Sequence, residues 1–106
     1  MCRMERLSNK AQKAALNSNM LYRLGAIVFK GGKILSWGYN HNNTHAEAHA
    51  LNKVKKAYGA SIFVARVSPT GLAMAKPCNN CMKILSEKGI KRIFYTTRNG
   101  IEEMRN

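Results

Sequence analysis

Three candidate metal ligands constrain this chain more than any other feature, because they stand far apart in the sequence. His45 opens the segment His45-Ala46-Glu47, and two cysteines lie in Pro77-Cys78-Asn79-Asn80-Cys81. One imidazole and two thiolates can bind a zinc ion and leave its fourth position open, which is typical of catalytic zinc. Structural sites are closed by four protein ligands. The fold must therefore bring two distant segments together around one metal ion.

Glu47 stands two residues after the histidine, where its carboxylate can act on a water at the open position. Zinc lowers the pKa of bound water from ~15.7 to about 7 and makes hydroxide available at neutral pH. A nearby carboxylate is suited to accept a proton from that water and deliver it to a substrate. The two motifs predict a hydrolytic zinc enzyme with Glu47 as its catalytic proton shuttle.

Other uses of these residues leave more of the pattern unexplained. His45 and His49 have the spacing of the metalloprotease motif His-Glu-x-x-His, but Ala46 stands where that motif needs glutamate. We interpret His49 as a helix-packing or surface residue. A closed structural zinc site would need His41 or His49 as a fourth ligand and would leave Glu47 without a role. A redox pair and a catalytically inert zinc module are further alternatives.

Length and composition indicate one small globular domain over residues 1–106, with 45% apolar residues. No apolar run approaches the ~18 residues of a membrane span, so no membrane partner is expected. The N-terminal residues are polar and amphipathic, unlike a signal peptide. Three cysteines do not form a disulfide scaffold, and we assign no role to Cys2. A cytoplasmic location follows, in a cell or in a virus-infected host cell.

The charge of the chain is strongly positive. Eighteen Lys and Arg residues face five Glu residues, which gives a net charge of +13. Such a surface attracts phosphate, either on a free nucleotide or along a polynucleotide. The basic residues are scattered along the chain, so a solvated and highly soluble surface explains them equally well.

Apolar spacing and turn residues predict an alternating order of elements. A helix is expected over residues 5–18, and a hairpin of residues 23–30 and 33–39 turns at Gly31-Gly32. A second helix from about 45 to 58 follows, with Thr44 or a neighbour as its cap and Gly59 at its end. Later elements are a strand over 61–67, a loop over 68–76, a helix from 78 or 79 to 88, and a strand over 90–96. The last ten residues read as a short helix or a frayed tail.

This order is typical of a three-layer α/β fold with parallel pairing of the later strands. It places His45 at the start of one helix and the two cysteines at the start of another, at one end of the sheet. Unpaired amides and the positive end of the helix dipole favour thiolate over thiol. We therefore expect both cysteines to be predisposed to metal binding.

The same motifs, His-x-Glu followed by Pro-Cys-x-x-Cys, are the signature of zinc nucleobase deaminases. The chain resembles the cytidine and deoxycytidylate deaminase superfamily over most of its length, and it looks most like a short deoxycytidylate deaminase. Residues 25–28 with 33–40 resemble the family's hairpin and its Gly-Tyr-Asn, here Gly38-Tyr39-Asn40. Residues 89–95 resemble the strand after its third helix. His45-Ala46-Glu47-Ala48-His49-Ala50-Leu51 is also similar to the deaminase domain of riboflavin biosynthesis.

The resemblance implies a three-layer α/β/α cytidine-deaminase-like sandwich with a mixed four- to five-stranded sheet. It implies one Zn²⁺ per chain, with His45, Cys78 and Cys81 as metal ligands. It further implies that the side chain of Asn40 and the amide of Ala46 contact the substrate, and that the protein is a homo-oligomer. Because the chain ends soon after residue 96, we expect the family's fifth strand and last helix to be missing.

Two enzyme functions follow from these observations. The first is hydrolytic deamination of a free cytosine nucleotide, such as dCMP or CMP, to its uracil counterpart with release of ammonia. The second is deamination of a base in single-stranded DNA or RNA, including tRNA, which the charge of +13 favours. Against the second, no aromatic stacking platform stands out in the sequence. Neither the base nor the sugar can be read from the motifs.

Overall fold

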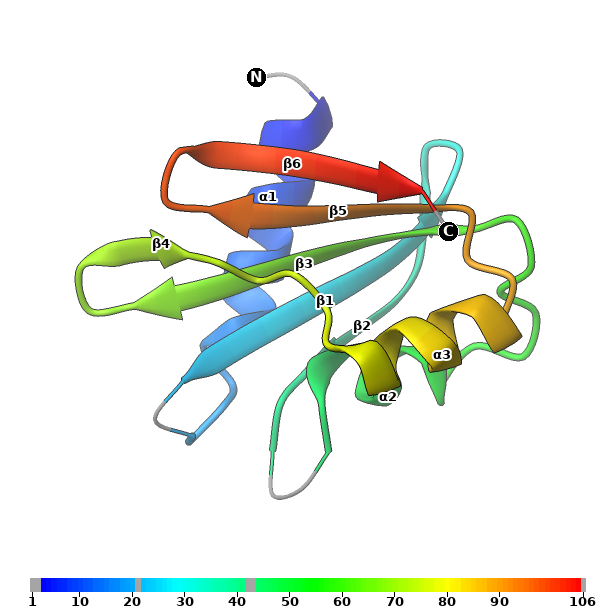
Figure 1. The fold of residues 1–106 in the computed structure, drawn as a ribbon, viewed down its shortest axis with the longest axis horizontal. Helices are drawn as coiled ribbons and strands as arrows, with labels where there is room; N and C mark the ends of the chain where they lie inside the picture. Colours follow the sequence, from blue (N-terminus) through cyan, green and yellow to red (C-terminus); the bar gives the residue numbers. More distant parts are fainter. Residues whose placement is uncertain (1–2, 21, 42–43, 106) are drawn as a thin grey trace.

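The computed structural model describes residues 3–20, 22–41 and 44–105, which form one mixed sheet with helices on both faces (Figure 1). The elements are α1 (Arg3–Ala15), β1 (Arg23–Lys30), β2 (Lys33–Tyr39), α2 (Ala46–Leu51), β3 (Ser61–Ser68), β4 (Gly71–Ala73), α3 (Asn79–Glu87), β5 (Arg92–Thr97) and β6 (Gly100–Arg105). Cys2 lies outside the described residues. Among these elements, no helix is long and apolar enough to cross a membrane.

The sheet has the strand order β2-β1-β3-β5-β6, and β4 pairs with β3 off this path. β1 is antiparallel to both of its neighbours, and β3 and β5 are parallel. The parallel pairing follows from the crossover through α3, because two parallel neighbours cannot be joined by a tight turn. The predicted hairpin is present, and Gly31 supplies the positive φ of 60° that its turn requires.

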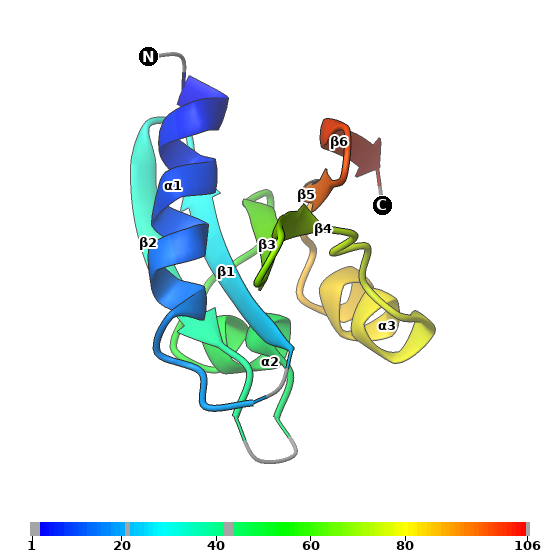
Figure 2. The same ribbon diagram turned by 90° about the vertical axis from the view of Figure 1, so that its left-hand side faces the viewer.

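Alternation of side chains along the central strands builds two cores, one on each face of the sheet. On one face, Leu7 and Ala11 of α1 pack against Phe29, Phe63 and Phe94. On the other face, residues of α2 and α3 pack against a separate aliphatic cluster. Its strand members are Ala26, Val28, Ile62, Val64, Ile93 and Tyr95. Figure 2 shows α1 on one side of the sheet and α2 with α3 on the other, which confirms the three-layer α/β/α architecture.

The sheet has six strands, whereas four to five were expected. Residues 68–76 were predicted to be a loop, but Gly71–Ala73 form β4 and pair with the end of β3. The tail was expected to be a short helix or frayed, and it forms β6, paired antiparallel with β5. Arg98 and Asn99 are the two-residue turn between these strands. The Asn99-Gly100 dipeptide after an apolar strand is the hairpin signal that the sequence reading missed.

The second helix ends at Leu51 and not near Tyr58, so the predicted length was wrong. Its N-cap is His45, whose side chain makes no capping hydrogen bond. After Leu51 the chain finds other backbone partners: the Gly59 amide donates to the Gly89 carbonyl at 2.9 Å, and the Lys91 amide donates to the Ala60 carbonyl at 2.8 Å. These hydrogen bonds hold the segment after Leu51 against the turn that follows α3. The helical spacing of the apolar residues in this segment is therefore not enough to extend α2.

Candidate metal centre

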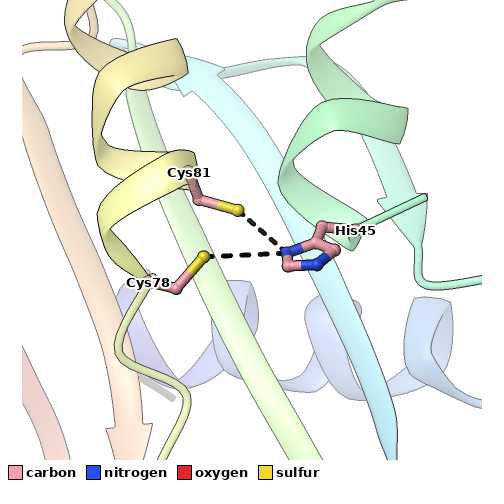
Figure 3. Close-up of side chains that lie close together, drawn as sticks. All are labelled: His45, Cys78 and Cys81. Carbon is pink, nitrogen blue, oxygen red and sulfur yellow. Dashed lines mark hydrogen bonds between the residues drawn. The ribbon is translucent and has the colours of Figure 1, made fainter. Parts of the chain in front are cut away.

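Two helix starts on the same face of the sheet bring the three candidate ligands together (Figure 3). His45 is the N-cap of α2, and Cys78 is the N-cap of α3, with Cys81 in its first turn. The His45 Nδ1 lies 3.0 Å from the Cys81 Sγ and 3.9 Å from the Cys78 Sγ. All three ligand atoms lie within 4.8 Å of one another.

The donor set fits a zinc ion. With Zn–N near ~2.0 Å and Zn–S near ~2.3 Å, ligand atoms of a tetrahedral site stand roughly 3.3–3.8 Å apart. The two nitrogen–sulfur distances of 3.0 and 3.9 Å bracket that range. One imidazole with two sulfurs is also a ligand combination that zinc prefers. The three residues leave the fourth position of such a site for water or substrate.

Glu47 lies in the first turn of α2, two residues after His45, and it is only 4% exposed. Burial raises the pKa of the Glu47 carboxyl, because removal from water disfavours the charged form. Its own backbone amide, the charge of His45 and a hydrogen bond with Cys81 act in the opposite direction. A carboxyl group in this environment holds a proton more readily than an exposed one.

Cys81 is buried, and Cys78 is exposed. Burial, followed by the charge of the nearby Glu47 carboxylate and the neighbouring Cys78, raises the pKa of the Cys81 thiol. This environment opposes the preference for thiolate that we expect from the helix N-terminus. Metal binding must displace the thiol proton, because the thiolate is the ligand form.

The metal cluster opens onto a cavity of about 730 Å³. His45, Ala46, Glu47 and Asn40 are among the residues that line it. The remaining lining residues come from the segment before β1, from β1 and β3, from the segment before α2, and from the segment between β4 and α3; they are Met20, Tyr22, Leu24, Thr44, Arg66, Met74, Ala75, Lys76 and Cys78. The cavity has the size and mixed lining of a small-molecule site.

Asn40 is held in place by the chain that leads into β1. Its Oδ1 accepts a hydrogen bond from the Leu24 amide at 2.8 Å, and its Nδ2 donates to the Tyr22 carbonyl at 2.6 Å. The amide group keeps one further acceptor site and one further N–H. The side chain is thus oriented before any substrate arrives.

The other two histidines lie apart from the metal cluster. The His49 Nδ1 is 3.1 Å from the Tyr39 amide nitrogen, and its ring packs edge-on against Tyr39 at 4.8 Å. The His41 and His49 rings are 4.5 Å apart. Burial, Lys53 and His41 lower the pKa of His49. This packing position agrees with the interpretation of His49 from the sequence.

Arg66 is a charged residue of the cavity that the sequence analysis did not single out. Its signal was available, because Arg66 interrupts the apolar strand Ile62-Phe63-Val64-Ala65 at a point where a charge has no structural use. Tyr22 and Met74 could not be recognised as cavity residues in the same way, because an aromatic or methionine residue in a linking segment can serve many structural roles.

The fold and the cluster define a mixed α/β domain with a candidate metal site at two helix starts, and comparison with known proteins places it in a family. Residues 1–97 match the cytidine and deoxycytidylate deaminase zinc-binding region. The chain therefore belongs to the cytidine and deoxycytidylate deaminase family.

Proteins of known structure or function are similar to this chain in sequence, in fold or in both. The dCMP deaminase of the cyanophage S-TIM5 is 26% identical, with a TM-score of 0.71 over 92% of this chain and 86% of that one. A cytidine deaminase from Burkholderia pseudomallei is 20% identical and shares the fold, with a TM-score of 0.79 over 99% of this chain and 93% of its own. The riboflavin biosynthesis protein RibD of Aquifex aeolicus is 33% identical over 94 residues, which take in 78% of this chain and 26% of that protein. The chain thus spans about a quarter of that relative.

Proposed function

We propose that this protein is a zinc-dependent hydrolase that deaminates a free cytosine nucleotide such as dCMP or CMP. Water and the cytosine base would give the uracil base and ammonia. The observation that carries the proposal is the cluster of His45, Cys78 and Cys81 next to a cavity that buried Glu47 also lines. The likeness to a solved dCMP deaminase supports the choice of substrate.

In this proposal His45, Cys78 and Cys81 hold one Zn²⁺ per chain, and the bound ion supplies an activated water. Glu47 would take one proton from the attacking water and deliver it to the ring nitrogen, while the water oxygen bonds to the carbon that bears the amine. The remaining hydroxyl proton would then pass to the amine, and the carbon–nitrogen bond would break to release ammonia. The environment of Glu47 supports this role, because burial raises the pKa of its carboxyl and so helps it to hold a proton between the two transfers.

Ala46 and Asn40 would position the base and sugar. Ala46 is the first residue of α2, where a backbone N–H has no acceptor within the helix and can donate to a substrate. It is buried and lines the cavity, so a base bound there would be shielded from water. The anchored Asn40 amide would offer its remaining donor and acceptor to the sugar.

A substrate panel tests the proposal. Zinc-loaded protein is incubated with cytidine, deoxycytidine and their 5′-monophosphates, and ammonia and the uracil product are quantified. We expect turnover of at least one monophosphate. Turnover of oligonucleotides with none on this panel would overturn the proposal.

A second candidate substrate comes from the likeness to RibD. A solved relative from Thermotoga maritima, 25% identical with a TM-score of 0.59, is a diaminohydroxyphosphoribosylaminopyrimidine deaminase joined to a reductase. A phosphoribosylaminopyrimidine therefore belongs on the panel. Its deamination in the absence of dCMP or CMP turnover would favour this second candidate.

Deamination of a base in single-stranded DNA or RNA is the remaining alternative. The net charge of +13 supports it, since phosphate contacts dominate such binding and make it dependent on salt. A gel shift with single-stranded oligonucleotides at low salt tests it directly. Absence of binding there would exclude this alternative.

We also propose that the protein works as a homo-oligomer. The support is that β2 and β6 each have a neighbour on only one side in the described part of the sheet. Open strand edges favour association with a second chain. Light scattering after size-exclusion chromatography measures the mass, and a value near the 11.9 kDa of one chain would contradict this.

A further inference from the structure

Two cations, Arg66 and Lys76, line the same cavity as His45 and Glu47. Arg66 lies near the end of β3, and Lys76 lies between β4 and α3, directly before Pro77. β3 and the segment after β4 thus each contribute one cation to the cavity. A cavity that processes an uncharged base has no evident need for two positive charges.

The backbone of Arg66 is fixed by the strands on both sides. Its amide donates to the Thr96 Oγ1 at 3.1 Å, and the same hydroxyl donates to the Ala73 carbonyl at 2.8 Å. Thr96 is fully buried. The hydroxyl of Thr96 thus links β5 to both β3 and β4, and it fixes the backbone from which the Arg66 side chain extends.

The guanidinium group is oriented but not neutralised. Its Cζ lies 4.3 Å from the ring centroid of Tyr22, so one face of the group stacks on the aromatic ring. The Nε of Arg66 is buried and has no hydrogen-bond partner among the described residues. No ion pair joins Arg66 to a carboxylate within residues 3–20, 22–41 and 44–105.

An oriented donor without an acceptor indicates a missing ligand. A buried N–H that gives up water without gaining a partner destabilises the fold, and such groups are rare in native proteins. Stacking on Tyr22 directs the N–H groups of the guanidinium sideways, in the plane where they can form paired bonds to phosphate oxygens. The exposed Lys76 adds a mobile charge at the same cavity.

We propose that Arg66, stacked on Tyr22 and assisted by Lys76, binds the terminal phosphate of the nucleotide and selects nucleotides over nucleosides. This inference rests on the proposed function, because it names the group that the cavity recognises. Arg66 would be a specificity-determining residue that contacts the phosphate and takes no part in proton transfer. The same chemistry could bind a phosphodiester of a polynucleotide, and the test separates the two sources.

Two variants and one control define the experiment. Arg66→Gln removes the charge and keeps a polar side chain, while Arg66→Lys keeps the charge and loses the paired geometry. Arg6→Gln is the control, because this substitution removes the same net charge far from the cavity. Arg6 is an exposed residue of α1, which lies on the other side of the sheet from α2 and α3. Each zinc-loaded protein is assayed with deoxycytidine, dCMP and a deoxycytidine-containing trinucleotide without terminal phosphate.

We expect Arg66→Gln to lower kcat/KM on dCMP by about 10- to 100-fold, mainly through KM, as loss of a charge-assisted hydrogen bond predicts. Activity on deoxycytidine should stay within about twofold, Arg66→Lys should be intermediate, and Arg6→Gln should match the wild type. An equal loss on deoxycytidine and dCMP would overturn the inference. A loss confined to the trinucleotide would overturn it as well.

Calorimetric binding of dCMP and of inorganic phosphate gives a readout that needs no turnover. The wild type should bind dCMP at least about tenfold more tightly than Arg66→Gln does. If no compound on the panel is deaminated but this difference is present, the proposed function fails while the phosphate subsite stands. If both proteins bind dCMP and phosphate equally, the inference is wrong whatever the activity.

Discussion

Gly38 of β2 lies directly beneath the backbone of Ala50 in α2. A Cβ atom at Gly38 would stand 2.5 Å from the Ala50 nitrogen and 2.9 Å from the Ala46 carbonyl oxygen. Beside this contact, the Ser36 hydroxyl donates to the Ala50 carbonyl at 2.8 Å. The helix that carries Glu47 therefore rests on the sheet at a distance that only glycine permits.

Substitution of Gly38 by alanine should displace this helix and weaken the site. Because the added methyl group meets backbone atoms that cannot rotate away, we expect a loss of about 1–3 kcal/mol in the free energy of unfolding. Turnover should fall as well, since Glu47 and His45 move with α2. Chemical denaturation and the nucleotide assay measure the two effects.

Gly32→Ala is the matched control for this prediction. Nothing lies within 4 Å of a Cβ at Gly32, so its unfolding free energy should change by about 0.5 kcal/mol or less. Equal stability of the two variants would contradict the packing argument.

Replacing Glu47 by glutamine should abolish proton transfer while leaving the metal ligands intact. General acid–base groups contribute about 10²- to 10⁴-fold to rate, so kcat should fall by at least about 100-fold. The zinc content, measured by atomic absorption, should stay the same as in the wild type. Turnover that persists in a zinc-loaded Glu47→Gln protein would rule out the proposed shuttle.

Removal of zinc should lower both stability and activity. An ion bound only by the folded state stabilises it by mass action, about 4 kcal/mol at a concentration 1,000-fold above Kd. A chelator should therefore reduce the melting temperature, and added zinc should restore it. In Cys81→Ser, which lacks one proposed ligand, the chelator should change the melting temperature little. A wild-type melting temperature that the chelator leaves unchanged would contradict the proposed metal centre.

The β5–β6 hairpin should lose part of its stability in acid. Arg92 forms two hydrogen bonds with Glu103, at 2.6 and 3.0 Å, and this pairing lowers the pKa of Glu103 from its usual value. A carboxylate whose pKa is lower in the folded state stabilises the fold above the unfolded pKa of about 4.5. That contribution disappears as the pH falls through the lower, folded value.

Glu103→Gln tests this pH dependence. Because both side chains are exposed to solvent, the variant should melt only slightly below the wild type at pH 7. The two melting temperatures should converge as the pH is lowered below about 4. A difference that is constant from pH 7 to pH 3 would show that the ion pair is not its cause.

Local sequence patterns were sufficient to predict an element wherever the pattern is compatible with a single structure. The strands around Gly31-Gly32 follow from alternation and a turn dipeptide, and they are confirmed at their predicted bounds. The convergence of His45 with Cys78 and Cys81 was expected from motif spacing, and the structure brings these residues together. Their catalytic and ligand roles stay predictions.

The sequence was insufficient where distant backbone groups compete with local preference. Residues 52–58 have helical spacing, but nearby backbone bonds to Gly89 and Lys91 end α2 early. β6 has too little apolar character to indicate a strand alone, and its pairing with β5 decides its structure. Arg66 is a different case, because its charge after an apolar run was a visible signal, but only the structure shows that it lines the cavity.

The hydroxyl of Thr96 has a consequence for how this enzyme could diversify. It fastens the β3–β4 hairpin to β5, while His45, Cys78 and Cys81 stand on helix starts that make no use of that link. Under the proposals above, the reaction and the choice of substrate would depend on separate parts of the chain. Substitutions in the hairpin would then change which substrate binds, while the residues proposed for the reaction stay the same.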